Sequence, residues 1–494
     1  MCLELFYLLI GFITSFCCIL LNSCRRPTNY PPGPKWLPFV GNTPLLKKLS
    51  RKLGGQHNAL SYLAEKYNSN IIGLKLGSQL FVVVNSESLI KQVFARNEFQ
   101  ARPDNFFIRL RSMGERKGIT MTDGPLWQEQ RLFALLHLRD LGFGKQAMEK
   151  LILDELEKML CKLGSGGAVV WNAVLAPSVL NVLWTLAAGT PFGDEQDATL
   201  TSLLRLMDER SRAFDMAGGV LSQLPWLRHV APELTGFTLI QNLNTQLSQL
   251  LKDTIHMHKK TLQEGVVRDF IDVFLHQMSV TNGGPTTFTE DQLIMVCLDF
   301  FIAGSQTTSN TLNFALINMV LHPEICKKAQ DEIDHVLGDR KISAMADKNR
   351  LPYTEAVLLE SQRYQHVVPI SGPRRVLTDT KLEDYHIPEG TTVLINVRDV
   401  HHNSEKWEIP EVFRPERFLD SDGKFCPQEL YLFSCGKRRC LGEPLAKNFV
   451  FLFFVSILKN YTMSPSPGEP TPTLDPTPGI TLSPKANCIL LNPR

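Results

Sequence analysis

The stretch Phe433-Ser-Cys-Gly-Lys-Arg-Arg-Cys-Leu-Gly442 lies between a polar, proline-containing passage and an apolar run with helical spacing, residues 443–459. This pattern predicts that Cys440 sits in a tight turn directly before a long helix. Gly436 and Gly442 bracket the turn and would let the backbone fold closely around the sulfur without Cβ clashes. We therefore expect a thiol at a helix N-terminus.

The surroundings of Cys440 favour a thiolate that binds a metal. Unpaired backbone N–H groups and the positive end of a helix dipole stabilise a thiolate at this position. The basic residues at 437–439 are expected to lower the thiol pKa in the same direction. Phe433 can place an aromatic wall beside the sulfur. A buried thiolate with a flat apolar neighbour suits an axial ligand of haem iron.

Two other interpretations of Cys440 stay open on the residues alone. The cysteine could be structural, in a basic loop that precedes a helix. A zinc or iron–sulfur site is the second alternative, but Cys435 and Cys440 lack CxxC spacing and no partner pair is present elsewhere in the sequence.

Length and composition predict one large domain, mainly α with a smaller β portion. No Gly/Ser-rich linker, charge block or repeat divides the 494 residues after the first few dozen. The net charge of +2 gives no argument for a nucleic-acid partner. The eleven cysteines lack the even spacing of a disulfide framework, which indicates reduced thiols.

Residues 1–24 predict a single-pass transmembrane anchor. Residues 3–21 are almost wholly apolar, close to the roughly 20 residues that a membrane-spanning helix needs. Arg25 and Arg26 follow at once and place the following chain in the cytoplasm. A cleaved signal peptide is the alternative, but there the positive charges would precede the apolar run.

The chain after the anchor is expected to begin with a proline-rich, stiff hinge, residues 25–38, and to continue as the folded domain, residues 39–494. Residues 220–227 are apolar and are interrupted by Pro225. They are either a loop packed on the body or a segment that enters the membrane interface.

The longest helical pattern, residues 289–322, carries Ala303-Gly-Ser-Gln-Thr-Thr308 in its apolar middle. Glycine inside a helix is unfavourable by about 1 kcal/mol relative to alanine, so Gly304 indicates close approach by another group. Serine and threonine can bond to carbonyls of the preceding turn and bend or widen a helix. A widened groove beside a hydroxyl would suit a bound oxygen molecule.

Phe433, Gly436, Arg438, Cys440 and Gly442 have the spacing Phe-x-x-Gly-x-Arg-x-Cys-x-Gly, which resembles the haem-ligand signature of the cytochrome P450 family. The resemblance implies the cytochrome P450 fold in a single domain and haem b held through the cysteine. It also implies insertion of one atom of O2 into a lipophilic substrate by a haem-thiolate monooxygenase.

The motif that begins at Ala303 and Gly304 is similar to the family's oxygen-activation motif. By that resemblance the first threonine, Thr307, orients the water that supplies protons. The family has Asp or Glu where this chain has Gln306, and an amide hydrogen-bonds but does not titrate. Proton supply would then run through Thr307 and water, or by another route.

Trp127 and Arg131 lie four residues apart, hence on one helix face, and both can donate to a carboxylate. The pair resembles the Trp-x-x-x-Arg pattern of the family's C-helix, which implies that it binds a haem propionate. The resemblance implies that Arg102 and Arg374 face the propionates as well.

Glu360 and Arg363 lie three residues apart. They form either an exposed ion pair worth a few tenths of a kcal/mol or, by resemblance to the family's Glu-x-x-Arg signature, a structural network with Arg417.

The resemblance places ten residues beside the substrate. Residues 102–110 are expected to form a loop over the distal face of the haem, although an apolar loop taken alone more often serves packing than a pocket. The expected contacts are Phe106, Phe107, Ile108, Leu110, Asp299, Phe300, Val367, Val368, Ile370 and Ile480.

Electrons are expected to come from outside the chain, since no G-x-G-x-x-G or P-loop opens a βαβ unit. The resemblance implies NADPH–cytochrome P450 reductase at the endoplasmic reticulum membrane. A basic docking face could consist of Arg139, Lys145, Lys437, Arg439 and Lys447, or these charges could serve solubility alone.

The octapeptide from Ala303 to Asn310 is similar to that of insect family members that epoxidise methyl farnesoate in juvenile hormone synthesis. An ecdysteroid hydroxylase and a xenobiotic hydroxylase are alternatives. A reductase-independent haem-thiolate isomerase or dehydratase, and a non-catalytic haem sensor, would use the same cysteine.

Overall fold

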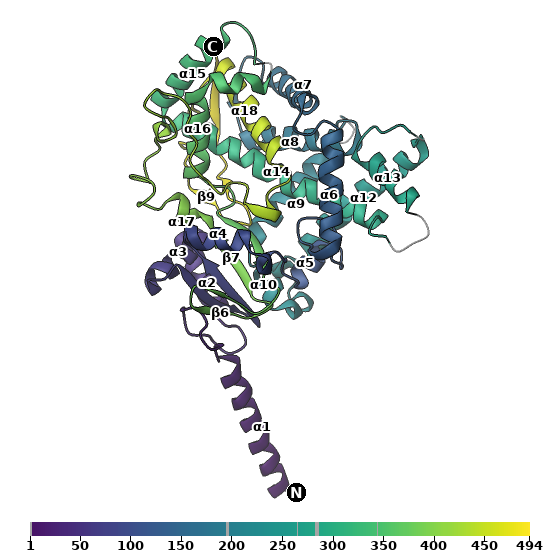
Figure 1. The fold of residues 1–494 in the computed structure, drawn as a ribbon, viewed down its shortest axis with the longest axis vertical. Helices are drawn as coiled ribbons and strands as arrows, with labels where there is room; N and C mark the ends of the chain where they lie inside the picture. Colours follow the sequence, from purple (N-terminus) through teal and green to yellow (C-terminus); the bar gives the residue numbers. More distant parts are fainter. Residues whose placement is uncertain (1, 194–196, 264, 282–285, 343) are drawn as a thin grey trace.

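A computed structural model describes residues 2–193, 197–263, 265–281, 286–342 and 344–494. It confirms one large, mainly helical domain with a smaller β portion (Figure 1). The helices are α1 (Cys2–Ser23), α2 (Thr43–Leu53), α3 (Gln56–Tyr67), α4 (Glu87–Ala95), α5 (Phe106–Arg111), α6 (Gly124–Asp140), α7 (Gln146–Leu163), α8 (Trp171–Ala188), α9 (Asp197–Ala213), α10 (Gly219–Gln223), α11 (Pro232–Thr235), α12 (Phe237–Thr261), α13 (Phe270–Val280), α14 (Glu290–Leu321), α15 (Pro323–Leu337), α16 (Pro352–Tyr364), α17 (Val397–His401) and α18 (Glu443–Asn460). The strands are β1 (Ile71–Leu76), β2 (Gln79–Val84), β3 (Gly167–Val169), β4 (Ile370–Arg375), β5 (Thr380–Leu382), β6 (Tyr385–Ile387), β7 (Thr392–Asn396), β8 (Tyr461–Pro465), β9 (Pro476–Thr477), β10 (Ser483–Pro484) and β11 (Ile489–Pro493).

Helix α14 runs through the middle of the body and packs against α8 and α18 (Figure 1). Its N-cap is Thr289, whose hydroxyl accepts a hydrogen bond from the Gln292 N–H. Apolar residues occur on all sides of α14, as expected for a helix that is buried along most of its length. The rest of the domain is arranged around this helix.

The largest sheet has the order β1-β2-β7-β4. Strands β1 and β2 form an antiparallel pair, β2 runs parallel to β7, and β7 runs antiparallel to β4. The register of β4 shifts between Ser371 and Arg374, which leaves the intervening carbonyls free for other partners.

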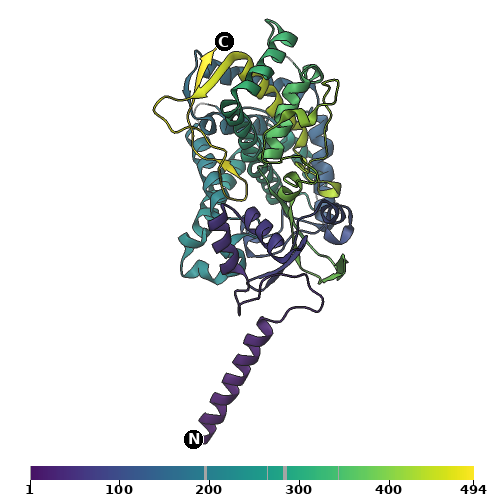
Figure 2. The same ribbon diagram turned by 90° about the vertical axis from the view of Figure 1, so that its left-hand side faces the viewer.

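Helix α1 projects away from one end of the body, and the C-terminus lies at the opposite end (Figures 1 and 2). Its described apolar side chains, such as Leu8 and Leu21, are exposed. By length and mean hydropathy one described helix, α8, could cross a membrane, but most of it is buried, as in the core helix of a soluble protein.

The proline-rich segment that follows α1 is docked on the sheet. Tyr30 is buried, and its hydroxyl donates to the Phe81 carbonyl at 2.8 Å. The Gly73 N–H donates to the Pro32 carbonyl at 2.8 Å, and a Cβ on Gly33 would lie 2.3 Å from the Gly73 oxygen. The expected extended segment is therefore held against β1 and β2.

Two expected loops contain helical turns. Within residues 102–110 the chain forms α5, because the Asn105 side chain accepts from the Ile108 N–H at 3.0 Å and caps the helix. The Pro225 segment contains α10 and a 3₁₀ helix, Pro225–His229, from which Trp226 projects 58% exposed.

Candidate active site

A cavity of about 840 Å³ lies inside the domain, and its wall includes the Cys440 loop and the middle of α14. Cys440 is accessible, and the surface it offers faces this cavity. Among the described residues this is by far the larger of the two best-formed cavities, the other being about 50 Å³. The cavity is therefore the candidate active site.

The Cys440 loop has the predicted form. A 3₁₀ turn, Gly436–Arg438, precedes the cysteine, and α18 begins at Glu443. The Cys440 N–H donates to the Phe433 carbonyl at 2.9 Å and closes the loop. Gly436 is required, because its φ is +69° and a Cβ would lie 2.6 Å from the Phe94 oxygen.

Gly442 has a different role from the one expected. Its φ of −80° suits any residue, so the turn itself does not require glycine there. A Cβ at this position would lie 3.9 Å from the Cys440 sulfur. Glycine at this position therefore leaves the side of the sulfur open.

Burial raises the pKa of the Cys440 thiol, while the Gly442 and Glu443 N–H groups and the Arg131 charge lower it. The helix N-terminus thus favours a thiolate as predicted. A coordinating metal cation would add to this, since it deprotonates a thiol outright.

The prediction that residues 437–439 lower the thiol pKa is supported for one of the three residues, because the Arg439 charge interacts with Cys440. The Arg439 guanidinium pairs with Glu443 at 2.7 Å. Lys437 donates to the Asn97 side chain, and Arg438 donates to the Gln100 and Thr122 carbonyls. The three basic side chains are thus held mainly by groups other than the sulfur.

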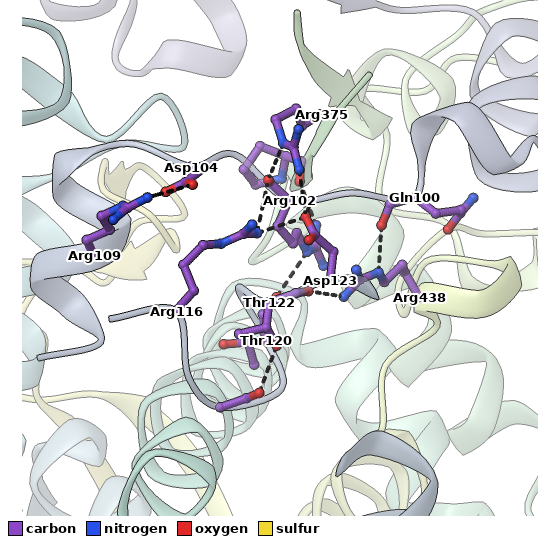
Figure 3. Close-up of polar contacts among 12 residues, drawn as sticks. Gln100, Arg102, Asp104, Arg109, Arg116, Thr120, Thr122, Asp123, Arg375 and Arg438 are labelled. Carbon is purple, nitrogen blue, oxygen red and sulfur yellow. Dashed lines mark hydrogen bonds and ion pairs between the residues drawn. The ribbon is translucent and has the colours of Figure 1, made fainter. Parts of the chain in front are cut away.

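Arginines gather on another part of the cavity wall. Figure 3 shows two of them, Arg102 and Arg438, with their polar contacts. The Arg102 guanidinium donates to the carbonyls of Thr120, Gly372 and Pro373, which lie near the register shift of β4. Asp123, the carboxylate nearest this group, already pairs with Arg116 and Arg375 (Figure 3).

Five cavity-lining arginines have no carboxylate partner within the described residues: Arg102, Arg131, Arg210, Arg374 and Arg438. Four of them form a cluster, because the charges of Arg102, Arg131 and Arg438 all act on Arg374. Arg374 is 1% exposed, and its Nε and Nη1 atoms have no hydrogen-bond partner. Burial, then the neighbouring arginines, lower the pKa of Arg374, and burial first of all lowers that of Arg438 to about 9. Such a cluster calls for a ligand with more than one carboxylate.

Haem b fits this wall, because it has two propionates for the arginine cluster and an iron that can take the Cys440 sulfur. Trp127 and Arg131 on α6 both line the cavity, as the helical spacing indicated. The Arg438 guanidinium lies 3.7 Å from the Trp127 ring centroid, so Arg438 joins this group too. The residues that would hold the haem are thus assembled in one place.

Ala303, Gly304, Gln306 and Thr307 of α14 all line the cavity. The Thr307 hydroxyl donates to the Ala303 carbonyl at 2.8 Å. A Cβ on Gly304 would lie 2.6 Å from Leu183 Cδ1, so the close approach inferred from this glycine is made by α8. The α-helix itself is continuous through the motif.

The expected substrate contacts divide into two groups. Phe300, Val367, Val368 and Ile480 line the cavity, as does Asp299. The cavity wall does not include Phe106, Phe107, Ile108, Leu110 or Ile370. The first four pack in a separate apolar cluster with Phe214 and Ile240, and Ile370 is a buried residue of β4 within the sheet. The expected direct contact of these five residues with the substrate is therefore corrected: they lie behind the cavity wall.

Asp299 is engaged within the protein. One carboxylate oxygen accepts from the Ile119 and Thr120 N–H groups, and the other accepts from Arg111 at 2.5 Å and from the Thr120 hydroxyl. These four donors use the acceptor sites of a carboxylate. The expected contact with substrate is therefore replaced by an internal ion pair.

Glu360, Arg363 and Arg417 meet in a buried network rather than an exposed pair. The Arg363 Nε and Nη2 atoms donate to Glu360 at 2.7 and 2.8 Å, and Arg417 Nε donates at 3.1 Å. Glu360 and Arg363 are fully buried.

Arg111 and Arg210 line the cavity, and sequence reasoning missed both. A charged residue on an otherwise apolar helix face can be recognised in a sequence as a candidate site residue. Arg210, however, lies on α9 among several exposed charges. Only the three-dimensional structure separates it from Arg205 and Arg212, which form surface ion pairs.

The model of the family described as Cytochrome P450 matches residues 31–491. The chain is 44% identical over 492 residues to probable cytochrome P450 305a1 of Drosophila melanogaster, a match that covers 97% of this chain and 96% of that protein. It is 38% identical over 478 residues to farnesoate epoxidase of Bombyx mori, with 96% of each covered, and 37% identical over 499 residues to cytochrome P450 2J1 of Oryctolagus cuniculus, with 99% and 96% covered. The Cys440 loop on the wall of a large arginine-rich cavity agrees with these matches, and the chain belongs to the cytochrome P450 family of monooxygenases.

Proposed function

We propose that this protein is a membrane-anchored monooxygenase that uses NADPH-derived electrons to oxidise a slender lipophilic substrate, with methyl farnesoate epoxidation as the leading candidate. The observation that carries the proposal is the single cavity shared by Cys440, the arginine cluster and the Thr307 motif. When bound, haem with a thiolate ligand supplies the oxygen-activating chemistry.

Within that cavity Thr307 is proposed to position water. Its hydroxyl hydrogen is donated to the Ala303 carbonyl, so its remaining lone pairs can only accept. A water molecule that donates to Thr307 is held with a defined orientation. Gln306 lines the same wall and can hold this water but cannot release a proton.

A separate reductase is proposed to dock on the basic face defined above, Arg139, Lys145, Lys437, Arg439 and Lys447. All five side chains are exposed, which supports this role. Arg439 and Lys447 both pair with Glu443, so part of the charge is neutralised. Because docking of the reductase would depend on attraction between exposed charges, it should weaken as the salt concentration rises.

The substrate proposal is supported by the likeness to a protein named farnesoate epoxidase and by an apolar wall that includes Phe300, Val367 and Ile480. The two alternative reactions, hydroxylation of an ecdysteroid and hydroxylation of a xenobiotic, would take place in the same cavity. Terpenoids, steroids and fatty acids should be titrated side by side into the purified haem protein, and the products of turnover should be identified. Spectral binding and epoxidation of methyl farnesoate are expected, and exclusive hydroxylation of a steroid would reject this substrate.

The same preparation separates a monooxygenase from the two other haem-thiolate classes. With reductase and NADPH we expect oxygen consumption coupled to product. A haem-thiolate isomerase or dehydratase would turn over without NADPH, and a haem sensor would form no product, so either result would reject the proposal.

A further inference from the structure

The cavity contains a second cationic site that the haem-binding residues do not use. Arg210 of α9 is 7% exposed and lines the cavity. Within the described residues its guanidinium forms no hydrogen bond or ion pair, and its Nε is buried without a partner. A buried guanidinium without a partner is costly, so a ligand group that supplies the missing acceptor is expected.

The charged groups around Arg210 do not neutralise the positive charge of its guanidinium. The charges that act on its guanidinium belong to Arg111 and Asp299. Arg111 donates to Asp299 through Nη2, while its Nη1 is also buried without a partner. Asp299 already accepts four hydrogen bonds and has no acceptor site left for Arg210. Two guanidinium groups thus share one saturated carboxylate.

The two groups of arginines meet at Arg102. The charges that act on Arg374 belong to Arg102, Arg438 and Arg131, whereas those that act on Arg210 belong to Arg111 and Asp299, which also act on Arg102. The next residue, Ser211, hydrogen-bonds to Thr481, so Arg210 lies where α9 meets the C-terminal loop. Met121, Met216 and Ile480 line the large cavity and, together with Arg111 and Arg210, also line the second cavity of about 50 Å³.

We propose that Arg210, supported by Arg111, binds the carboxylate of lipophilic acids, so that such acids bind more tightly than the corresponding methyl esters, methyl farnesoate included. The assignment rests on the proposed monooxygenase function and specifies its substrate class. A carboxylate would bring the local charge from +1 to zero and could accept from the Arg210 guanidinium and from Nη1 of Arg111. An ester accepts hydrogen bonds but has no charge, so it leaves the excess positive charge buried.

Binding of the acid end at Arg210 also orients the substrate. The hydrocarbon chain would extend along the apolar wall toward Cys440, which lines the same cavity. The distance from the carboxylate would then select the carbon that is oxidised. Substrate specificity and the position of oxidation should therefore both depend on Arg210.

The test is equilibrium binding of matched acid and ester pairs to the full-length haem protein at pH 7.5. The probes are farnesoic acid with methyl farnesoate, and lauric acid with methyl laurate. Spectral titration measures the dissociation constants, and calorimetry serves for ligands that give no spectral change. For the unmodified protein we expect each acid to bind about 10- to 100-fold more tightly than its ester, as for a charge-assisted hydrogen bond.

The Arg210→Gln variant should abolish this preference by weakening acid binding, with little change for esters, and Arg210→Lys should restore part of it. The control is Arg212→Gln on the same helix, where the arginine is half-exposed and pairs with Asp208. Its acid preference should be unchanged. Product analysis of Arg210→Gln should show a broader set of oxidised positions.

Equal affinity of acid and ester in the unmodified protein would overturn the inference, whether or not the variants fold. An equal loss of acid and ester binding in Arg210→Gln would also overturn it, because it would indicate a haem or packing role. If laurate shows the preference while no terpenoid binds, the carboxylate site stands and the farnesoate proposal fails. If methyl farnesoate is epoxidised but binds as tightly as the acid, the farnesoate proposal stands and the carboxylate site is rejected.

Discussion

At the scale of single residues, the environment of Cys440 combines opposing effects. Burial disfavours the thiolate, and the N–H groups at the start of α18 together with Arg131 favour it. The accessible surface of the sulfur faces the cavity. This arrangement suits a sulfur that binds a metal inside the protein rather than a redox-active surface thiol.

Replacement of this sulfur should remove the spectral sign of thiolate ligation. The Cys440→Ser protein is expected to lose the ferrous–CO Soret band that thiolate-ligated haem gives, because serine does not supply a soft anionic donor. Difference spectra of reduced, CO-treated protein measure this. Cys426→Ser, an exposed cysteine elsewhere, should keep the band. An unchanged band in Cys440→Ser would discard the ligand assignment.

Loss of the Thr307 hydroxyl should separate oxygen consumption from product formation. In Thr307→Ala the oriented water loses its acceptor, so we expect product per NADPH to fall several-fold while NADPH oxidation continues. The control is Ser309→Ala, whose buried hydroxyl bonds to the Ser305 carbonyl at 2.8 Å and does not line the cavity. Full coupling in Thr307→Ala would remove this residue from the proton route.

At the scale of elements, the Glu360 network joins α16 to the chain that leads toward the Cys440 loop. Arg363 also donates to the carbonyls of His401 and Pro410, and Arg417 donates to those of Glu408 and Val412. Helix α16 is thereby fixed against the 3₁₀ turn Pro415–Phe418. The network is structural, since none of the three charged residues lines the cavity.

The Glu360→Gln variant should be strongly destabilised. It leaves two buried guanidinium charges without their carboxylate, which costs about 3–5 kcal/mol of unfolding free energy. Denaturant unfolding and retention of haem measure the loss. Glu416→Gln is the control, because it breaks only a half-exposed pair with Lys328, which is worth about 1 kcal/mol or less. Similar stability of the two variants would contradict a structural role for the network.

At the scale of the whole molecule, α1 and the body are separable. The hydrogen bond from Lys75 Nζ to the Ser23 carbonyl joins the end of α1 to the sheet. The proline-rich segment beyond it is docked through Tyr30 and Gly33. The folded domain therefore does not depend on α1 for its core.

Deletion of residues 1–24 should move the protein from the membrane fraction to the supernatant. We expect the truncated protein to keep its CO band, because residues 25–38 and their contacts with the sheet remain. Fractionation by centrifugation followed by difference spectra measures both properties. A truncated protein that stays with the membrane, or that loses haem, would contradict an anchor confined to these residues.

Local patterns predicted much of this architecture. The turn before α18, the long α14 and the helical faces that carry Trp127 and Arg131 follow from periodicity and from the requirements of glycine and proline. Packing decided the rest. The aromatic segment around Phe107 contains a capped helical turn and lies behind the cavity wall, because Phe214 and Ile240, far along the chain, provide an apolar surface for it.

The sequence by itself determined the helical class, the position of Cys440 at a helix N-terminus and the family, because each depends on residues close together in the chain. Tertiary structure alone decided which charges are satisfied. Asp299 is saturated by the Ile119 and Thr120 N–H groups and Arg111, roughly 180 residues away, whereas Arg210 finds no partner in the part of the chain that the structure describes. Electrostatic compensation depends on distances through space, and those are set only when the helices pack.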